Sequence, residues 1–311
     1  MSPRPLVHSW CAVVPTLGAP TLGASLAALR AQDPPPHVIL VAQRPIEEGA
    51  RRLADTVLDL PAPIGFAAAV NLGLSRAPRD FVALVNDDAV VEPGWVGPLL
   101  EQLLRDPRLA ATQGANRLPE RRIDGCGIAW NSDWQAIQIG HGQELAGAPA
   151  HREIFGVSAT AALYRREALS GCASAHGILD ERLESFYEDV DLAVRLRAAG
   201  FPANFVPEAQ ALHQGSLTTG RDPFRKSFLL TRNRCWVVAR LLGRDFAGAR
   251  AIVDRRDRRD SLGALARLDF VRVRGIREGR RAAMDRLGEF AHDGQPLVSR
   301  QVLAAFGAPG R

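Results

Sequence analysis

The first third of the chain alternates short apolar runs with segments whose apolar residues recur at helical spacing. Apolar runs that predict strands lie at 9–14, 37–42, 55–60 and 81–85. Segments that predict helices lie at 21–30, 46–54, 66–77 and 93–105. The run at 37–42 is apolar throughout, as expected of a parallel strand covered on both faces. This alternation predicts an α/β fold with an open, mostly parallel sheet flanked by helices.

The rest of the chain is less regular and then becomes helical. Further strands are expected at 109–115, 154–163, 203–206 and 209–213, with a hairpin or meander at 123–140. Helices are expected at 223–242, 246–256 and 261 to about 287. We therefore predict one α/β domain over residues 1–222 and a helical C-terminal region over residues 223–311.

Charge is distributed unevenly over these two regions. Residues 221–311 hold 21 Arg plus Lys and 10 Asp plus Glu, a net charge of +11, while the rest of the chain holds 18 and 24, a net charge of −6. A basic C-terminal region suggests contact with an anionic surface, and the alternative is a solvated helical face. Nucleic acid is not expected as a partner.

Three features bear on location. The sequence has no uncharged apolar run of 18 residues, so no membrane-spanning helix is expected. The apolar stretch near the N-terminus is broken by Pro15 and is interpreted as a strand and not as a secretory signal. The four cysteines form no C-x-x-C pair, which favours structural thiols over a disulfide framework or a zinc site. We expect a cytoplasmic protein.

The densest group of carboxylates comes just before a predicted helix. Four of them fall within eight residues, the last three being Glu188, Asp189 and Asp191. Carboxylates suit a helix N-terminus because the helix dipole is positive there, and Asp191 is spaced to pair with Arg195. By itself the stretch predicts a capped helix with an acidic first turn, or a carboxylate base at the start of that helix.

A second acidic pair, Asp87 and Asp88, directly follows the strand at 81–85. Ligands of open α/β sheets bind at the carboxyl ends of strands. Two carboxylates there can hold a Mg²⁺ or Mn²⁺ ion that bridges a diphosphate, although adjacent aspartates are also common in turns. His213 closes a short apolar strand, where a histidine is usually structural but can complete a Mn²⁺ site.

In their order and spacing, these motifs resemble those of the family 2 glycosyltransferases with a GT-A fold, especially the rhamnosyltransferase-like branch. The matching segments lie at 13–16, 65–74, 84–95, 179–183, 187–200 and 213–215. The resemblance covers about residues 9 to 240. It implies a Rossmann-like GT-A domain that moves a sugar from a nucleotide-diphosphate donor to an acceptor hydroxyl, with inversion and with a divalent cation.

The resemblance also implies a role for individual residues around the donor. Asp88 would bind Mn²⁺ or Mg²⁺ on the donor diphosphate, with Asn86 and Asp87 beside it, and His213 would be a further metal ligand. Pro15 and Thr16 would line the nucleotide pocket. Asn71 would lie near the diphosphate or the ribose.

On the acceptor side, the resemblance implies that Asp189 is the catalytic base, with Glu188 as its neighbour in the acidic motif. Such a base would deprotonate the acceptor hydroxyl, which would then displace the nucleotide directly. Asp191 and Arg195 would hold the start of the helix in place.

One departure from the family pattern concerns the nucleotide. The family usually has an aspartate just after the second strand that reads the base, but here the strand is followed by Gln43 and Arg44. Either residue could contact a base or a phosphate, and Asp59 after the third strand could partly substitute. The donor is therefore expected to be a dTDP- or a UDP-sugar without a choice between them.

The segment 223–242 interleaves aromatic and aliphatic residues with arginines and a lysine. Such a basic amphipathic segment can lie on an anionic membrane, which suits a family that often glycosylates lipid-linked acceptors of the cell envelope. The alternative, of equal weight with the membrane role, is that this segment packs on the domain or forms a homodimer contact.

Three other functions fit the sequence less well. A nucleotidyltransferase usually carries a basic, Gly-rich phosphate loop after the first strand, and the loop at 17–23 has no base. A catalytically degenerate module that binds a membrane or a partner is opposed by the joint presence of Asp88, Asp189 and His213. A dehydrogenase is disfavoured because no G-x-G-x-x-G follows the first strand.

Overall fold

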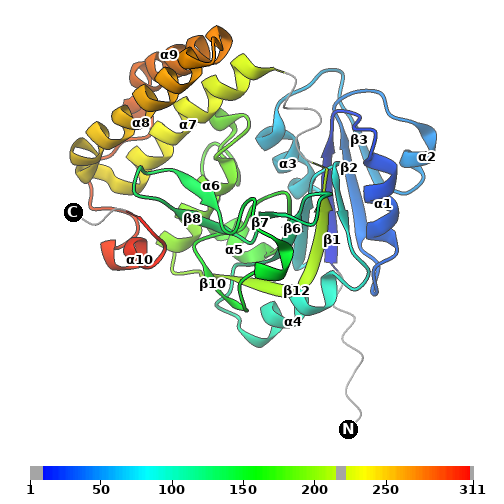
Figure 1. Ribbon diagram of the computed structural model, residues 1–311. Helices are drawn as coiled ribbons and strands as arrows, with labels where there is room; N and C mark the ends of the chain where they lie inside the picture. The colour runs from blue at the N-terminus through cyan, green and yellow to red at the C-terminus, as the bar shows by residue number, and fades with distance from the viewer. Residues whose placement is uncertain (1–9, 215–221, 309–311) are drawn as a thin grey trace.

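The computed structural model describes residues 10–214 and 222–308 (Figure 1). The predicted start of the first strand at Ser9 and the Gly215 of the last matching motif lie outside these residues. The strands are β1 (Trp10–Thr16), β2 (His37–Ala42), β3 (Thr56–Asp59), β4 (Phe81–Val85), β5 (Ala89–Val91), β6 (Ala111–Arg117), β7 (Ile123–Gly125), β8 (Ile128–Trp130), β9 (Ala136–Gln138), β10 (Arg152–Ile154), β11 (Ala161–Arg165) and β12 (Ala203–His213).

The helices alternate with the strands in the first half and dominate after residue 222. The α-helices are α1 (Leu22–Arg30), α2 (Glu48–Arg51), α3 (Phe66–Ser75), α4 (Val96–Arg105), α5 (Arg166–Gly171), α6 (Glu188–Ala198), α7 (Pro223–Leu242), α8 (Phe246–Ala266), α9 (Phe270–Asp285) and α10 (Arg300–Ala305). Short 3₁₀ turns are η1 (Leu145–Gly147), η2 (Glu181–Leu183), η4 (Gly243–Asp245) and η5 (Leu287–Glu289).

One large mixed sheet organises the chain. Its strand order is β10-β12-β6-β11-β4-β1-β2-β3, with β5 paired to β12 and β7 paired to β6. Strands β4, β1, β2 and β3 run parallel, so their carboxyl ends meet at one edge, while β11 is inserted antiparallel between β4 and β6. The predicted α/β class with a mostly parallel first half is confirmed.

The two faces of the sheet carry separate apolar cores because side chains alternate along each strand. On β1, Trp10, Ala12 and Val14 pack with α1 and α4, whereas Cys11 and Val13 pack with α3 and α6. Helix α3 approaches β1 closely at Gly73, where an added Cβ would lie 2.4 Å from a methyl of Val13.

Helices α7, α8 and α9 pack side by side, on the side of the molecule away from α1 (Figure 1). A third apolar core joins them to the rest of the fold. It includes Trp236, Val237 and Leu241 of α7 together with Trp130 and Val194. Of the alternatives for the segment 223–242, packing on the domain is therefore the one observed for these residues. Within the described residues, no helix is both long and apolar enough to cross a bilayer.

The expected strand at 154–163 is wrong in its extent. The structure has β10, ending at Ile154, and β11, beginning at Ala161, with an irregular segment between them. In that segment the Ser158 N–H donates to the Gln113 side chain at 2.6 Å, and the Ala159 N–H donates to Asp189 at 3.3 Å. These amides serve side chains instead of a neighbouring strand.

The expected boundary between the last long helices is also wrong. Helix α8 runs through the charged stretch to Ala266, and the chain turns at Leu268, whose φ is 56°. An i, i+4 ion pair between Arg256 and Asp260, 3.0 Å long, accompanies the helical path through that stretch.

Candidate active site

The carboxyl ends of β1, β2 and β4 open into a cavity of about 680 Å³. This volume lies in the range of small-molecule sites. Segments far apart in the sequence close it, and its lining consists of residues 15–17, 43–44, 63–66, 86–88, 128, 136–138, 158–160, 184–190, 213, 225 and 230. Predicted site residues that lie in this lining are Pro15, Thr16, Gln43, Asn86, Asp87, Asp88, Glu188, Asp189 and His213.

Asp87 organises the loop that follows β1. Its Oδ2 accepts a 2.5 Å hydrogen bond from the Thr16 hydroxyl and longer ones, 3.3 Å each, from the N–H groups of Leu17 and Ala19. Burial raises the pKa of Asp87, although the bond from Thr16 opposes the rise. The side chain of Asp87 is thus engaged with the loop after β1, while the buried Oδ1 of Asn86 has no hydrogen-bond partner in the described residues.

Asp88 and His213 meet inside the cavity. The Nε2 of His213 lies 3.3 Å from an Asp88 carboxylate oxygen, and its Nδ1 lies 2.8 Å from Asp124 Oδ2. Burial alone would lower the pKa of His213, but the hydrogen bonds and charges of Asp124 and Asp88 outweigh burial and raise this pKa to about 9. The pairing of β12 with β5 brings His213 opposite Ala89 and so beside Asp88.

These donors suit a hard divalent cation that also binds a substrate. No cluster of three or more His, Cys, Asp or Glu side chains arranged for a metal ion occurs in residues 10–214 and 222–308. Mg²⁺ and Mn²⁺ sites of this kind commonly take one or two protein ligands and complete their shell with phosphate oxygens and water. The carboxylate of Asp88 and the ring nitrogen of His213 fit that role.

Asp189 lies in the first turn of α6, as predicted, with its carboxylate held by the segment before β11. Its Oδ2 accepts from the Ala159 N–H at 3.3 Å and its Oδ1 from the Val190 N–H at 2.8 Å. Burial raises the pKa of Asp189 despite these bonds. Its neighbour Glu188 is buried, and burial together with the charge of Asp189 raises the pKa of Glu188 well above its usual range.

The same segment ties the two acidic elements together. The Asn86 N–H donates to the Thr160 carbonyl at 2.9 Å, one residue from the amide that binds Asp189. The strand end that carries Asp88 and the helix start that carries Asp189 therefore share a rigid support.

The loop before α6 has an unusual backbone. Glu184, Phe186 and Tyr187 have φ angles of 63°, 64° and 68°, a region that non-glycine residues rarely adopt. The Nδ2 of Asn233 on α7 lies 2.7–2.9 Å from the carbonyl oxygens of Leu183, Ser185 and Phe186. Helix α7 thereby fixes the strained loop, which lines the cavity.

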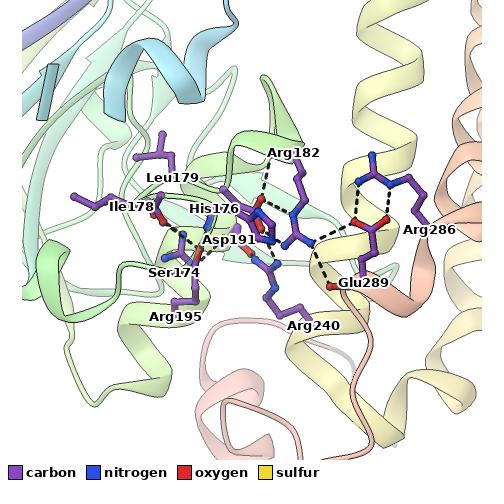
Figure 2. A network of polar contacts seen from close by, with 12 residues as sticks. Ser174, His176, Ile178, Leu179, Arg182, Asp191, Arg195, Arg240, Arg286 and Glu289 are labelled. Atoms are coloured by element: carbon purple, nitrogen blue, oxygen red, sulfur yellow. Dashed lines mark hydrogen bonds and ion pairs between the residues drawn. The ribbon is translucent and has the colours of Figure 1, made fainter. Parts of the chain in front are cut away.

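Asp191 points away from the cavity into a buried ion-pair network, shown in Figure 2. Its Oδ2 pairs with Arg195 at 2.8 Å, the predicted i, i+4 contact, and its Oδ1 pairs with Arg240 of α7. Arg240 also pairs with Asp180 at 2.7 Å, and Arg182 joins Asp180 at 2.6 Å. This network thus ties helix α6 both to Asp180 and Arg182, which precede it in the sequence, and to Arg240 of α7, which follows it.

Two residues considered for the donor lie elsewhere. Asn71 exchanges hydrogen bonds with the backbone of Leu179, 2.8 Å and 2.9 Å long, and is not among the described residues that line the large cavity. Asp59 forms two 2.7 Å bonds to Arg51 on the surface. Gln43 does lie in the lining, where its Oε1 accepts from the Ile64 N–H at 2.9 Å.

Comparison with known proteins supports the expected fold and family. The family described as "Glycosyltransferase like family 2" matches residues 8–244, which is most of the chain. The chain belongs to this family. It is a glycosyltransferase, and its fold is the GT-A fold that the motifs led us to expect.

Individual relatives are more distant. An N-acetylglucosaminyl-diphospho-decaprenol L-rhamnosyltransferase of Mycobacterium tuberculosis is 28% identical over 235 residues, which cover 66% of this chain and 75% of that protein. An uncharacterized protein of Sinorhizobium fredii is 26% identical over 185 residues, 56% of this chain and 20% of that one.

Among solved structures, GalNAc-T7 in complex with UDP, GalNAc and Mn²⁺ superposes with a TM-score of 0.55 at 14% identity. The match covers 76% of this glycosyltransferase and about half, 51%, of that chain. A likeness at this identity shows a shared fold.

Sequence reasoning missed several residues that support the site. Asp124 lies in a stretch without clear periodicity, yet it contacts His213, which is 89 positions away. Asn233 is one polar residue in a basic helix, and its partners are backbone groups nearly 50 positions earlier. The nearest signal was the matching motif at 179–183, which contains Asp180 and Arg182 of the ion-pair network.

Proposed function

We propose that this glycosyltransferase is an inverting, metal-dependent enzyme that moves a sugar from a nucleotide-diphosphate donor to the hydroxyl of a lipid-linked or cell-envelope glycan. The observation that carries the proposal is one cavity lined both by Asp88 with His213 and by Asp189. Asp88 and His213 suit a cation bound to the donor diphosphate. Asp189 suits a general base that acts on the acceptor hydroxyl.

Asp189 acts as the base. It accepts the proton of the acceptor hydroxyl as that oxygen attacks the anomeric carbon, and the bond from this carbon to the diphosphate oxygen breaks with the electron pair leaving on the diphosphate. A single displacement of this kind inverts the configuration. The raised pKa of Asp189 strengthens it as a base, while the amides of Ala159 and Val190 keep its carboxylate in position.

Asp88 and His213 would hold Mn²⁺ or Mg²⁺, and a cation held there would supply positive charge for the leaving diphosphate. Asp124 orients the His213 ring through Nδ1 and leaves Nε2 directed toward Asp88. Asn86, whose buried Oδ1 has no partner among the described residues, also lines the cavity, two residues before Asp88.

The donor is a dTDP- or UDP-sugar whose nucleotide lies over the ends of β1 and β2. Pro15, Thr16 and Gln43 line that end of the cavity. Asn71, which the family pattern places near the diphosphate or the ribose, bonds instead to the Leu179 backbone outside the cavity lining. The lipid-linked acceptor is proposed because the Mycobacterium relative is named for transfer to a diphospho-decaprenol carrier. The enzyme works in the cytoplasm at the inner face of the membrane.

Binding of nucleotides tests this proposal. Thermal shifts are measured with UDP, dTDP, GDP and their sugars, each with and without Mn²⁺. We expect one nucleotide to raise the Tm, and only when Mn²⁺ is present. Asp88→Asn should lose this shift, whereas the matched surface variant Asp106→Asn should keep it, because Asp106 pairs with Arg108 away from the cavity.

Two results would contradict the proposal. A shift of equal size without metal would remove the metal role of Asp88 and His213. No shift with any nucleotide would point to a catalytically degenerate module.

A further inference from the structure

Large exposed apolar side chains gather at one place in the described part of the chain. Five of the eight lie within residues 262–271, where the last turns of α8 meet the first turn of α9. They are Leu262, Leu265, Leu268, Phe270 and Val271, with exposed fractions of 47–73%. We call this segment the α8–α9 tip. A cluster of exposed apolar residues on a soluble fold usually marks an interaction surface.

The backbone of the tip strengthens this reading. Leu268 occupies the left-handed position just after α8, with a φ of 56°. Its N–H donates to the Leu265 carbonyl at 2.9 Å, and the Asp269 N–H donates to Ala264 at 3.0 Å, the bond pattern in which glycine is normally preferred. Leu268 is 73% exposed, so its side chain gains little packing in return for the strain. Stability of the fold does not explain a leucine here.

The charge around the tip is positive. Residues 261–278 contain four arginines and two acids. Asp269 caps α9 by accepting from the Arg272 N–H at 3.0 Å, and Glu278 pairs with Arg274 at 2.7 Å. Within the described residues no ion pair engages Arg267 or Arg277, both of which are exposed. A second copy of this chain would present the same positive charge, whereas an anionic surface complements it.

The tip lies at the cavity end of helix α7. Arg274 of α9 stacks over the Phe224 ring at 5.4 Å, and Gly275 packs on the Phe224 carbonyl. The next residue of α7, Arg225, lines the cavity and pairs with Glu184 at 2.7 Å. Arg274 lies one turn of α9 from the tip, and the Phe224 that it contacts directly precedes the cavity-lining Arg225.

We propose that the α8–α9 tip docks on an anionic phospholipid membrane. Leu268 and Phe270 enter the region between headgroups and acyl chains, and the arginines contact lipid phosphates. Docking in this way presents the nearby cavity to the bilayer surface. The inference rests on the proposed function, because an enzyme with a lipid-linked acceptor needs its cavity close to the bilayer surface.

Vesicle flotation tests the docking without any need for activity. The enzyme is mixed with vesicles of phosphatidylcholine alone or with added phosphatidylglycerol. We expect binding only to the phosphatidylglycerol vesicles, and a loss of about tenfold or more in partitioning for the double variant Leu268→Ser, Phe270→Ser. Leu297→Ser, an exposed leucine next to the far end of α7, should bind as wild type.

Charge variants separate the two contributions. Arg267→Glu with Arg277→Glu should abolish the preference for phosphatidylglycerol, whereas Arg244→Glu at the far end of α7 should retain it. An unchanged Tm in each variant shows that the fold is intact.

Three results would overturn the proposal: equal binding by wild type and the Leu268→Ser, Phe270→Ser variant, absence of vesicle binding by wild type, or a wild-type dimer that this variant dissociates. The last would make the tip a contact between copies. Asp189→Asn is expected to lose transfer but to bind vesicles as the wild type does. This variant therefore distinguishes a failure of docking from a failure of the proposed reaction.

Discussion

The side-chain amide of Asn233 lies 2.7 Å from the carbonyl oxygen of Phe186, two residues before the first turn that carries Asp189. Asn233 is fully buried, and its contacts hold a loop in which three of four residues have positive φ. A helix outside the sheet thus positions the start of the helix that bears the proposed base.

Asn233→Ala is expected to lower both stability and turnover. The variant removes the donor that the carbonyl oxygens of Ser185 and Phe186 share, which costs about 3 kcal/mol in the free energy of unfolding. The freed loop misplaces Asp189, so kcat falls while the donor Kd changes little. Chemical denaturation, transfer kinetics and donor titration measure the three quantities. Ser299→Ala, which removes the cap of α10, is a control that should lower stability and leave kcat unchanged. A normal kcat in Asn233→Ala would refute the positioning role.

Asp124→Asn is expected to weaken the proposed cation site without touching its ligands. Asp124 fixes the His213 ring, and loss of such an outer partner typically costs about 10–100-fold in metal affinity. The Mn²⁺ concentration that gives half-maximal donor binding should rise by that factor. Asp133→Asn is the matched control, because Asp133 is equally exposed but pairs with Arg256 and Arg259. An unchanged Mn²⁺ requirement in Asp124→Asn would contradict the assignment.

Transfer is expected to lose rate on the acid side at a high pH for a carboxylate base. Burial raises the pKa of Asp189, so the acid limb of kcat/KM should lie above the usual carboxylate value of about 4. Burial and the charge of Asp189 raise the pKa of Glu188 well above its usual range, so Glu188 is protonated on that limb and carries no charge. Glu188→Gln should therefore leave the acid limb in place. A wild-type limb near pH 4, or one that moves in Glu188→Gln, would contradict the assignment of this limb to Asp189.

Arg240→Met is expected to destabilise the fold strongly. Arg240 bridges Asp180 and Asp191, both fully buried, and breaking a buried pair costs about 3–5 kcal/mol. Urea unfolding at neutral pH measures the loss. Arg105→Met, which breaks an exposed pair with Glu101, should change little. If the two variants were equally stable, Arg240 would not be a residue that stabilises the position of α6.

The same network predicts an acid-sensitive contribution to stability. Burial would raise the pKa of Asp180, but bonds from Arg182 and Arg240 lower it to about 2. The stabilisation is therefore complete above about pH 4 and is lost as the pH falls toward 2. Arg240→Met should show a smaller loss over this range.

Local sequence pattern was sufficient for the parts of the site that depend on short motifs. Asp88 follows a buried parallel strand and Asp189 begins an amphipathic helix, so their places at a strand end and a helix start could be predicted. The geometry that joins them depends on the irregular backbone at 158–160, where amides bind side chains, and such a segment has no periodicity to detect.

The helical region shows a second limit. Trp236 and Val237 are spaced as on an amphipathic surface helix, but they are buried in a core shared with Trp130. Periodicity indicates an apolar side of a helix and does not say whether protein or lipid covers it. The turn at Leu268 was missed for a related reason, because no glycine or proline marks it.

The central claim is that Asp189 takes the proton from the acceptor in the cavity where Asp88 and His213 hold the donor. Its most direct test is the transfer rate of Asp189→Asn under saturating donor, acceptor and Mn²⁺, together with the donor Kd. We predict that transfer falls by about 10²–10⁴-fold while the Kd for the donor stays near the wild-type value. Transfer at the wild-type rate in Asp189→Asn would contradict the account.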